Sequence, residues 1–253
     1  MFLIIRNTFK FRIHFFFYVV MAVALFTGNI LNFLIFTSII VVHELGHIFG
    51  ALMFKWDIKE VVILPFGGLT VFNQKINTSL LEQFIVTLLG PLFQIVFFAL
   101  ISNFFSLSKS VIYYNFVLLV FNLLPIFPLD GSKFLFVFLC VIFPFKFSHL
   151  LVIFISFCTI VFLFFLVDYF DFLIFLILLF LIIKLVLEFS NHRLIFNKFL
   201  FERYSYCFNF KKIKIIKNIN SMYLMCKHVF FVDGEYITER NILRKRFDKY
   251  NKL

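Results

Sequence analysis

The chain has 253 residues, of which 63% are hydrophobic and only 15% are charged, and it carries a net charge of +11. A soluble domain of ordinary composition is less apolar and more highly charged, so these values exclude a soluble globular protein. They predict a polytopic membrane protein that contacts the lipid bilayer.

A helix needs about 20 apolar residues to cross a hydrocarbon core of roughly 30 Å. Six apolar segments predict an all-α bundle of about six transmembrane helices: 13–28, 30–54, 82–102, 111–143, 147–167 and 170–189. The fourth segment would make a single helix about 50 Å long. Because Pro125, Pro128 and Gly131 fall inside it, we expect this fourth helix to be broken.

The second segment contains the motif VVHELGHIFG at residues 41–50. His43 and His47 are four residues apart, so on a helix both imidazoles lie on one face, with Glu44 beside them. Such groups are costly inside a membrane unless they face protein, water or a metal. H-E-x-x-H is the zinc-protease arrangement, and the alternatives are two core histidines or a protein that binds or transports a metal.

A catalytic zinc usually takes three protein ligands and leaves its fourth position to water. Asp130 is the candidate third ligand, in the stretch FNLLPIFPLDG at residues 121–131, where the helix is predicted to break. A carboxylate that caps the next helical segment is the alternative interpretation. Farther up the chain, Gly67 and Gly68 indicate a turn.

Basic residues cluster in alternate connections and so orient the bundle: Arg6, Lys10, Arg12, Lys55, Lys59, Lys75 and Lys146. The opposite connections carry only Lys109, together with Asp168 and Asp171. The positive-inside rule therefore places both termini in the cytoplasm.

The composition changes after residue 192, which divides the chain into a transmembrane domain, 1–192, and a cytoplasmic tail, 193–253. The tail holds 14 Lys and Arg residues against 5 Asp and Glu residues. This charge attracts anionic lipid, and no recognition motif accompanies it, so we expect no nucleic-acid partner. Residues 227–243 predict a strand, a turn at Asp233–Gly234, a strand and a helix, which makes the tail a small α+β region.

The HELGH motif and the later N-x-x-P-x-x-P-L-D-G motif together resemble the site-2 protease family of intramembrane zinc metalloproteases. The resemblance covers most of the chain, including LPFGG at 64–68, LLGPLFQ at 88–94 and FLFERY at 199–204. It implies that His43, His47 and Asp130 hold one Zn²⁺ ion per chain. It also implies that Glu44 is the general base.

The resemblance assigns substrate binding to two further places. Asn122 would contact the substrate or the developing oxyanion, and Pro128 belongs to the same motif. Gly67 and Gly68 would lie in a membrane-associated loop that positions an extended substrate. The tail resembles an abbreviated cystathionine-β-synthase (CBS) domain, and because it is so short we assign no ATP site to it.

These features predict an enzyme that hydrolyses a peptide bond of a membrane-associated protein near the cytoplasmic face. Glu44 would accept the proton of a zinc-activated water. The resemblance implies two alternative substrates. In the first alternative, the enzyme activates a sporulation sigma-factor precursor, is inhibited by other membrane proteins and lies in the membrane surrounding the forespore. In the second, it cleaves an anti-sigma factor. The short chain without a PDZ-like insertion favours the first.

Overall fold

The computed structural model describes residues 10–64, 67–73, 75–104, 109–166, 172–232 and 234–248. The predicted turn residue Asp233 and the loop residues Asp168 and Asp171 lie outside these ranges. The chain divides into two compact units, Met1–Gln74 with Glu82–Leu124 and Lys75–Leu81 with Pro125–Leu253. Each unit is described separately below.

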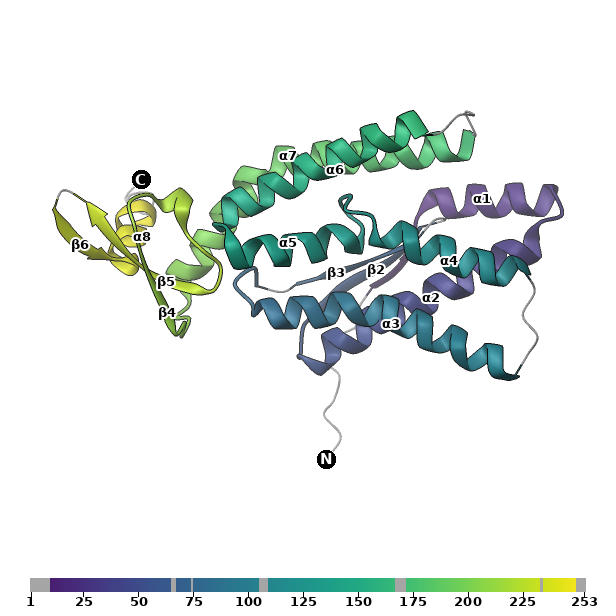
Figure 1. Ribbon diagram of the computed structural model, residues 1–253, viewed down its shortest axis with the longest axis horizontal. Helices are drawn as coiled ribbons and strands as arrows, with labels where there is room; N and C mark the ends of the chain where they lie inside the picture. Colours follow the sequence, from purple (N-terminus) through teal and green to yellow (C-terminus); the bar gives the residue numbers. More distant parts are fainter. Residues whose placement is uncertain are drawn as a thin grey trace. The chain divides into compact units, whose positions relative to one another are not determined.

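The first unit combines helices with a three-stranded sheet (Figure 1). Its elements are β1 (Lys10–Ile13), α1 (Phe15–Phe26), α2 (Ile30–Met53), β2 (Ile58–Leu64), β3 (Gly67–Phe72), most of α3 (Leu80–Phe104) and α4 (Lys109–Leu123). The strand order is β1-β2-β3, with β1 parallel and β3 antiparallel to β2. β3 therefore lies at one edge of this sheet and also contacts α2.

The expectation of an all-α membrane region was wrong because of this sheet. The segment that forms β2 is too short to cross a bilayer, so a search for long apolar runs passed over it. Its β-branched residues favour a strand, and Ile58, Val61 and Ile63 are buried. Ile58 and Val61 belong to one core cluster, whereas Ile63 packs against residues of α1. Strand β1 pairs with β2 on this side.

Helix α2 buries one face along its length. Ile40, His43, His47 and Ala51 recur every three or four residues, and all four are almost fully buried. This period places them on one side of the helix. The two histidines are thus fixed by the same apolar periodicity that packs the helix.

Two glycines on α2 allow α3 to approach closely. A Cβ atom at Gly46 would overlap the backbone of Leu89, and one at Gly50 would lie 3.1 Å from the Cα of Val86. Larger residues at these positions would push the two helices apart. This close approach brings the backbone and side chains of α3 to the histidines.

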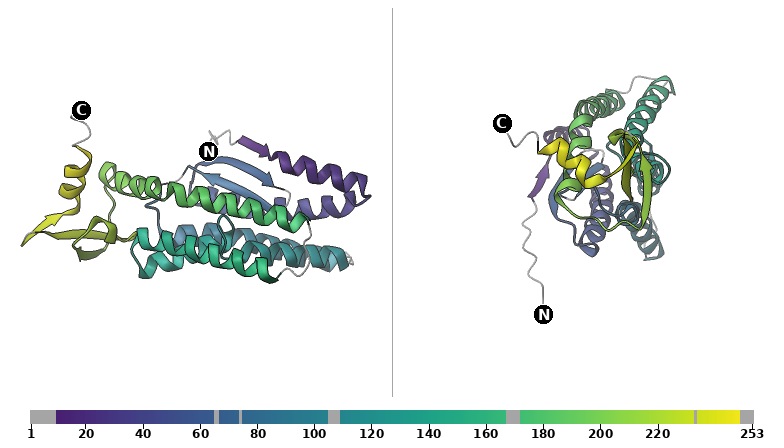
Figure 2. Two further views of the ribbon diagram at one scale, coloured as in Figure 1. Left: turned by 90° about the horizontal axis from the view of Figure 1, so that it is seen from above. Right: turned by 90° about the vertical axis from the view of Figure 1, so that its left-hand side faces the viewer.

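The second unit joins three helices to a small α+β region. Its elements are α5 (Asp130–Ile142), α6 (Phe145–Leu166), α7 (Phe172–Ser205), β4 (Lys212–Ile216), η1 (Ile219–Ser221), β5 (Cys226–Val232), β6 (Glu235–Thr238) and α8 (Glu239–Phe247). Helices α6 and α7 run side by side (Figures 1 and 2). The sheet order is β4-β5-β6, with β4 parallel and β6 antiparallel to β5.

A single apolar cluster ties this α+β region to the helices of its unit. Its almost fully buried members come from α6, α7, β5, α8 and the connection after η1: Phe145, Phe199, Leu200, Met222, Leu224, Phe230 and Leu243. Burying each such side chain contributes about 1.5–3 kcal/mol. The predicted strand, turn, strand and helix of the tail are confirmed for the described residues, but the likeness to a CBS domain stays a prediction.

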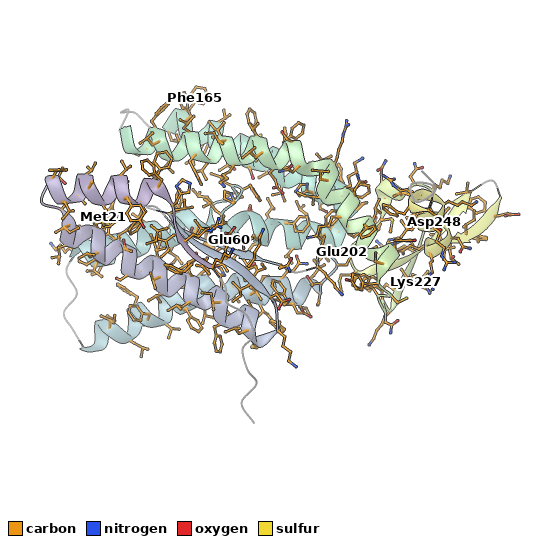
Figure 3. All side chains as sticks on the ribbon, turned by 180° about the vertical axis from the view of Figure 1, so that it is seen from behind. Met21, Glu60, Phe165, Glu202, Lys227 and Asp248 are labelled. Carbon is orange, nitrogen blue, oxygen red and sulfur yellow. The ribbon has the colours of Figure 1, made fainter. Side chains whose placement is uncertain are left out.

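Within the described residues, four helices are long and apolar enough to cross a membrane: Ile30–Met53, Leu80–Ser102, Phe145–Leu166 and Ile174–Ser205. The other two predicted spans are shorter here, since α1 ends at Phe26 and the fourth segment is divided into α4 and α5. The predicted break in the fourth helix is therefore confirmed, and a six-span count is not. Large apolar side chains such as Phe165 project from the helices, as lipid contact requires (Figure 3).

Candidate active site

The two histidines of the H-E-x-x-H motif lie against each other on α2. His43 and His47 are 2% and 3% exposed, and their Nε2 atoms are 3.2 Å apart. Residues four apart on a helix lie on the same face, so this spacing brings the two imidazole rings together. Two imidazole nitrogens therefore face one point inside the first unit.

Helix α3 fixes the opposite nitrogen of each ring. The Nδ1 atom of His43 is 2.9 Å from Oε1 of Gln94, and that of His47 is 2.9 Å from the carbonyl oxygen of Val86. Gln94 is oriented in turn, because its Nε2 donates to the carbonyl and side-chain oxygens of Asn115, at 2.9 and 3.0 Å. Both Nδ1 atoms thus carry hydrogens that oxygen atoms accept.

In neutral rings this tautomer leaves the Nε2 atoms of His43 and His47 with lone pairs. Two lone pairs facing each other are stabilised only when a proton or a metal cation lies between them. Zinc–nitrogen bonds of about 2.0–2.1 Å at a tetrahedral ion place two such nitrogens about 3.3 Å apart. The distance of 3.2 Å in this structure fits that requirement.

The carboxylate of Glu44 is buried and held by strand β3. It is 5% exposed, and its Oε2 accepts a hydrogen bond from the hydroxyl of Thr70. A Cβ atom at Gly68 would overlap this carboxylate, whereas one at Gly67 would lie 3.8 Å from Oδ1 of Asn122, an ordinary contact. Gly68 is thus needed for the strand to pass Glu44 closely.

The prediction that Gly67 and Gly68 form a turn was wrong. Both residues belong to β3 and pair with Leu64 and Ile63 of β2. A pair of glycines is typical of a turn in sequence, but here the absence of a side chain serves the approach to Glu44. Asn122, in the last turn of α4, is buried as well.

Asp130 is the first residue of α5 and is 5% exposed. Its Oδ1 accepts a hydrogen bond of 2.8 Å from Nζ of Lys133. Leu129 occupies the N-cap position, so Asp130 is not the residue that caps the helix. Pro128 lies in the connection between α4 and α5, after a cis peptide bond.

Several supporting residues were not predicted from the sequence. Gln94 and Asn115 are buried polar residues in apolar helices, which is the signal that could have revealed them. Thr70 gave no such signal, because threonine is common in strands. The role of Gly90 can be recognised only from the structure, in which a Cβ atom at this position would overlap the ring of His47.

The family model of peptidase family M50 matches residues 31–110, the stretch that holds both histidines, Glu44 and their partners on α3. This stretch of the chain is therefore similar to a peptidase family M50 domain. The predicted resemblance to the site-2 proteases, which form part of this family, is therefore confirmed.

Stage IV sporulation protein FB of Bacillus subtilis (strain 168) is 37% identical to this chain over 158 residues, which are 59% of this chain and 54% of that protein. A zinc metalloprotease of Methanocaldococcus jannaschii is 30% identical over 113 residues, 42% of this chain and 33% of that protein. The chain thus spans about half or less of the length of these curated relatives.

The fold is also similar to a solved structure, the site-2 protease from Methanocaldococcus jannaschii. The TM-score is 0.56 at 22% sequence identity, over 74% of this chain and 93% of that one. At this identity the likeness concerns the fold alone.

Proposed function

We propose that the chain is an intramembrane zinc metalloendopeptidase. The observation that carries this proposal is the histidine pair, whose Nδ1 atoms are tied to oxygens while their Nε2 atoms lie 3.2 Å apart. The carboxylate of Glu44 lies next to this pair in the chain and is buried. A core role for the histidines would leave this arrangement of nitrogens unexplained.

The zinc ligands in this proposal are His43, His47 and Asp130. The two histidines already have the outer hydrogen bonds that metal-ligating imidazoles usually make. Asp130 is supported by its burial and by its place at the break between α4 and α5. A zinc ion bound by these residues would polarise the scissile carbonyl and lower the pKa of a water molecule toward neutrality.

The residues of the chain would then handle the proton and the substrate. Glu44, oriented by the hydroxyl of Thr70, accepts a proton from water and returns it to the leaving amine. A helical substrate hides its carbonyls, so the cleaved segment must be extended. Strand β3 lies at the edge of its sheet, where an extended segment can pair with it near Gly67 and Gly68. Asn122 and Pro128 complete the proposed substrate contacts.

For the substrate we propose a membrane-associated sigma-factor precursor that is activated during sporulation. The 37% identity to a sporulation protein supports this choice over an anti-sigma factor. The distribution of basic residues supports cytoplasmic termini and cleavage near that face. In a sporulating cell the enzyme would lie in the membrane surrounding the forespore, under control of inhibitory membrane proteins.

Two variants of the full chain test this function when co-expressed with candidate precursors. Glu44→Gln keeps the proposed ligands and removes the base, so zinc should stay bound while cleavage falls about 10²–10⁴-fold. Asp130→Ala removes a ligand, so both zinc content and cleavage should be lost. Zinc per chain is measured on purified protein, and cleavage is measured by the change in size of the precursor.

Lys133→Met is the matched control for Asp130→Ala, because it breaks the same ion pair without removing the carboxylate. This control should keep its zinc. Full cleavage by Glu44→Gln would contradict the role of the base. Unchanged zinc in Asp130→Ala would remove Asp130 from the ligand set and leave the role of Glu44 standing.

A further inference from the structure

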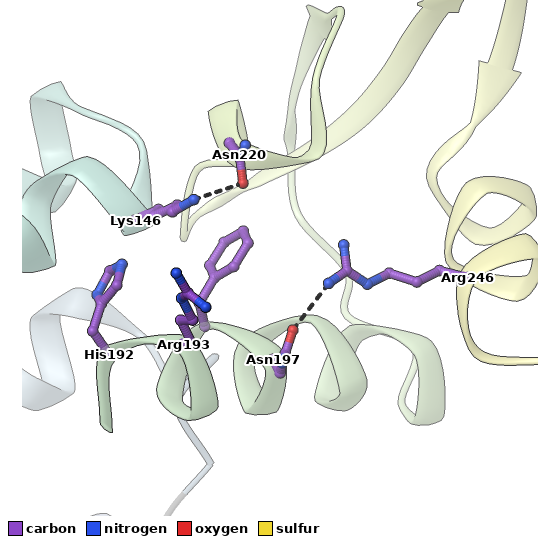
Figure 4. A pocket seen from close by; sticks show the side chains of 7 residues that line it. Lys146, His192, Arg193, Asn197, Asn220 and Arg246 are labelled. Carbon is purple, nitrogen blue, oxygen red and sulfur yellow. Dashed lines mark hydrogen bonds between the residues drawn. The ribbon is translucent and has the colours of Figure 1, made fainter. Parts of the chain in front are cut away.

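A pocket of about 200 Å³ in the second unit is lined mainly by cationic and amide side chains (Figure 4). They come from α6, α7, η1 and α8: Lys146, His192, Arg193, Asn197, Asn220 and Arg246. The ring of Phe196 completes the lining, with the ammonium group of Lys146 lying over it. None of these residues belongs to the proposed protease site.

The pocket concentrates positive charge without an acidic lining residue. Lys146, Arg193 and Arg246 carry permanent charges, and no Asp or Glu is among the described residues that line the pocket. The polar partners of two of these cations are neutral amides. Nζ of Lys146 donates to Oδ1 of Asn220, and Nη2 of Arg246 donates to Oδ1 of Asn197, both at 3.0 Å. These amides position the two cations without neutralising their charge.

His192 adds a buried polar atom that lacks a partner. The residue is 7% exposed, it lines the pocket, and its Nε2 makes no hydrogen bond within the described part of the chain. Its Nδ1 is 2.8 Å from Nδ1 of His149, whose Nε2 is 2.8 Å from a carboxylate oxygen of Glu188. Buried polar atoms normally find a partner, so this one indicates a ligand.

We propose that this pocket binds a phosphate-bearing anion. A phosphate group offers several strong acceptor oxygens, which suit guanidinium, ammonium and imidazole donors arranged around one space. The hydrogen of His192 then lies on Nε2, where it is donated to the anion. His192 Nδ1 then accepts a hydrogen bond from Nδ1 of His149, whose Nε2 lies 2.8 Å from Oε1 of Glu188.

Two sources could supply this chemistry. The pocket lies where the apolar sequence of α6 begins, at Phe145, and where the apolar part of α7 gives way to polar residues. That position suits the headgroup of an anionic phospholipid. A small soluble phosphate compound would present the same oxygens, so the experiment must separate the two.

The test uses the full chain in a non-ionic detergent and two probes, short-chain phosphatidylglycerol and inorganic pyrophosphate. Binding is measured by titration calorimetry, and its place by hydrogen exchange in peptides that contain Asn220 or Arg246. The double variant Arg193→Gln/Arg246→Gln should bind the recognised probe about tenfold more weakly or worse, because it loses two charge-assisted contacts.

The matched control is Arg240→Gln/Arg244→Gln, which removes the same charge from exposed positions of α8 that do not line the pocket. It should bind within about twofold of the unmodified protein, as surface charges contribute little. If the amides of β5 lose their protection from hydrogen exchange in the first double variant, that variant is unfolded, and Lys146→Gln is used in its place.

Saturable binding of phosphatidylglycerol that pyrophosphate does not displace would assign the site to a lipid headgroup. Binding of pyrophosphate alone would assign it to a soluble phosphate. The proposal is overturned if neither probe binds saturably, or if both double variants weaken binding equally, because general basic charge would then explain the effect. None of these results tests the proposed proteolytic function, because the pocket residues are not part of the proposed protease site.

Discussion

Two clusters of buried polar groups, the histidine pair of the first unit and the groups around Arg203 in the second, differ in how their hydrogen-bonding atoms are used. Arg203 is 7% exposed, and all five of its N–H donors have partners. They are the side chains of Asn77 and Glu239 and the carbonyl oxygens of Cys226, Tyr223 and Leu224. In the histidine pair, by contrast, the Nδ1 atom of each ring is hydrogen-bonded to an oxygen atom, and the two Nε2 atoms lie next to each other.

This difference separates the Arg203 cluster, whose donors are all used within the fold, from the proposed metal site. A saturated network such as that of Arg203 fixes one arrangement and has no capacity left for a ligand. The histidines are held by Gln94 and Val86 through their Nδ1 atoms, and their Nε2 atoms face each other. Burial alone therefore does not identify a functional site, and the orientation of the buried polar atoms must be considered as well.

The largest expected effect comes from breaking the saturated network with Arg203→Met. The substitution leaves the largely buried carboxylate of Glu239 without its guanidinium partner, so the free energy of unfolding of the second unit should fall by about 3–5 kcal/mol. Denaturant titration followed by hydrogen exchange in β5 measures this loss. Zinc content should not change.

Arg240→Met is the control, because Arg240 is exposed on α8. Its effect should stay within about 0.5 kcal/mol. Equal stability of Arg203→Met and Arg240→Met would show that the network around Arg203 is not structural, and the contrast with the histidine pair would then fail.

A smaller effect, on activity alone, is expected from Gly68→Ala at the reactive site. Its Cβ atom would overlap the carboxylate of Glu44, which must move. A displacement of about 1 Å at a catalytic group costs about 10²-fold in rate, while zinc should remain bound. Cleavage rate and zinc content are measured together in the co-expression assay.

Gly67→Ala is the matched control on the same strand, since its Cβ atom makes only an ordinary contact of 3.8 Å with Asn122. Its loss of rate should be smaller than that of Gly68→Ala, because an alanine at position 67 leaves the carboxylate of Glu44 in place. If both alanine variants were equally active, β3 would not be constraining Glu44.

The sequence predicted the residues of the proposed site more completely than the surroundings that orient them. His43, Glu44 and His47 share a short helical motif, so their meeting follows from local geometry. The break in the fourth helix was likewise predictable, because prolines limit helices locally.

The sheet and the supporting residues depend on contacts between distant segments. β1 pairs with β2 across roughly 50 residues of sequence, and Thr70 reaches Glu44 from a strand that resembles a glycine turn in sequence. The predicted boundary after residue 192 lies inside α7, which continues to Ser205. A change in composition marks where a helix becomes polar, and not where it ends.

The smallest expected effect concerns the response of the Arg203 network to mild acid. Burial raises the pKa of Glu239, but hydrogen bonds from His228 and the charge of Arg203 outweigh it and hold this pKa below its ordinary value of 4.5. A carboxyl group with a lowered pKa stabilises the fold above its unfolded pKa, and that stabilisation is lost as the pH falls through the folded pKa. Between pH 7.5 and 5.5, both above the unfolded pKa of 4.5, the contribution of Glu239 to the free energy of unfolding should therefore change by less than about 0.3 kcal/mol.

Protection factors of the β5 amides measure this contribution when the unmodified chain is compared with Glu239→Gln. Glu235→Gln is the exposed control on β6. The difference between the first two proteins should narrow only below pH 4.5, and narrowing already at pH 5.5 would mean that Arg203 and His228 do not hold Glu239 in its charged form.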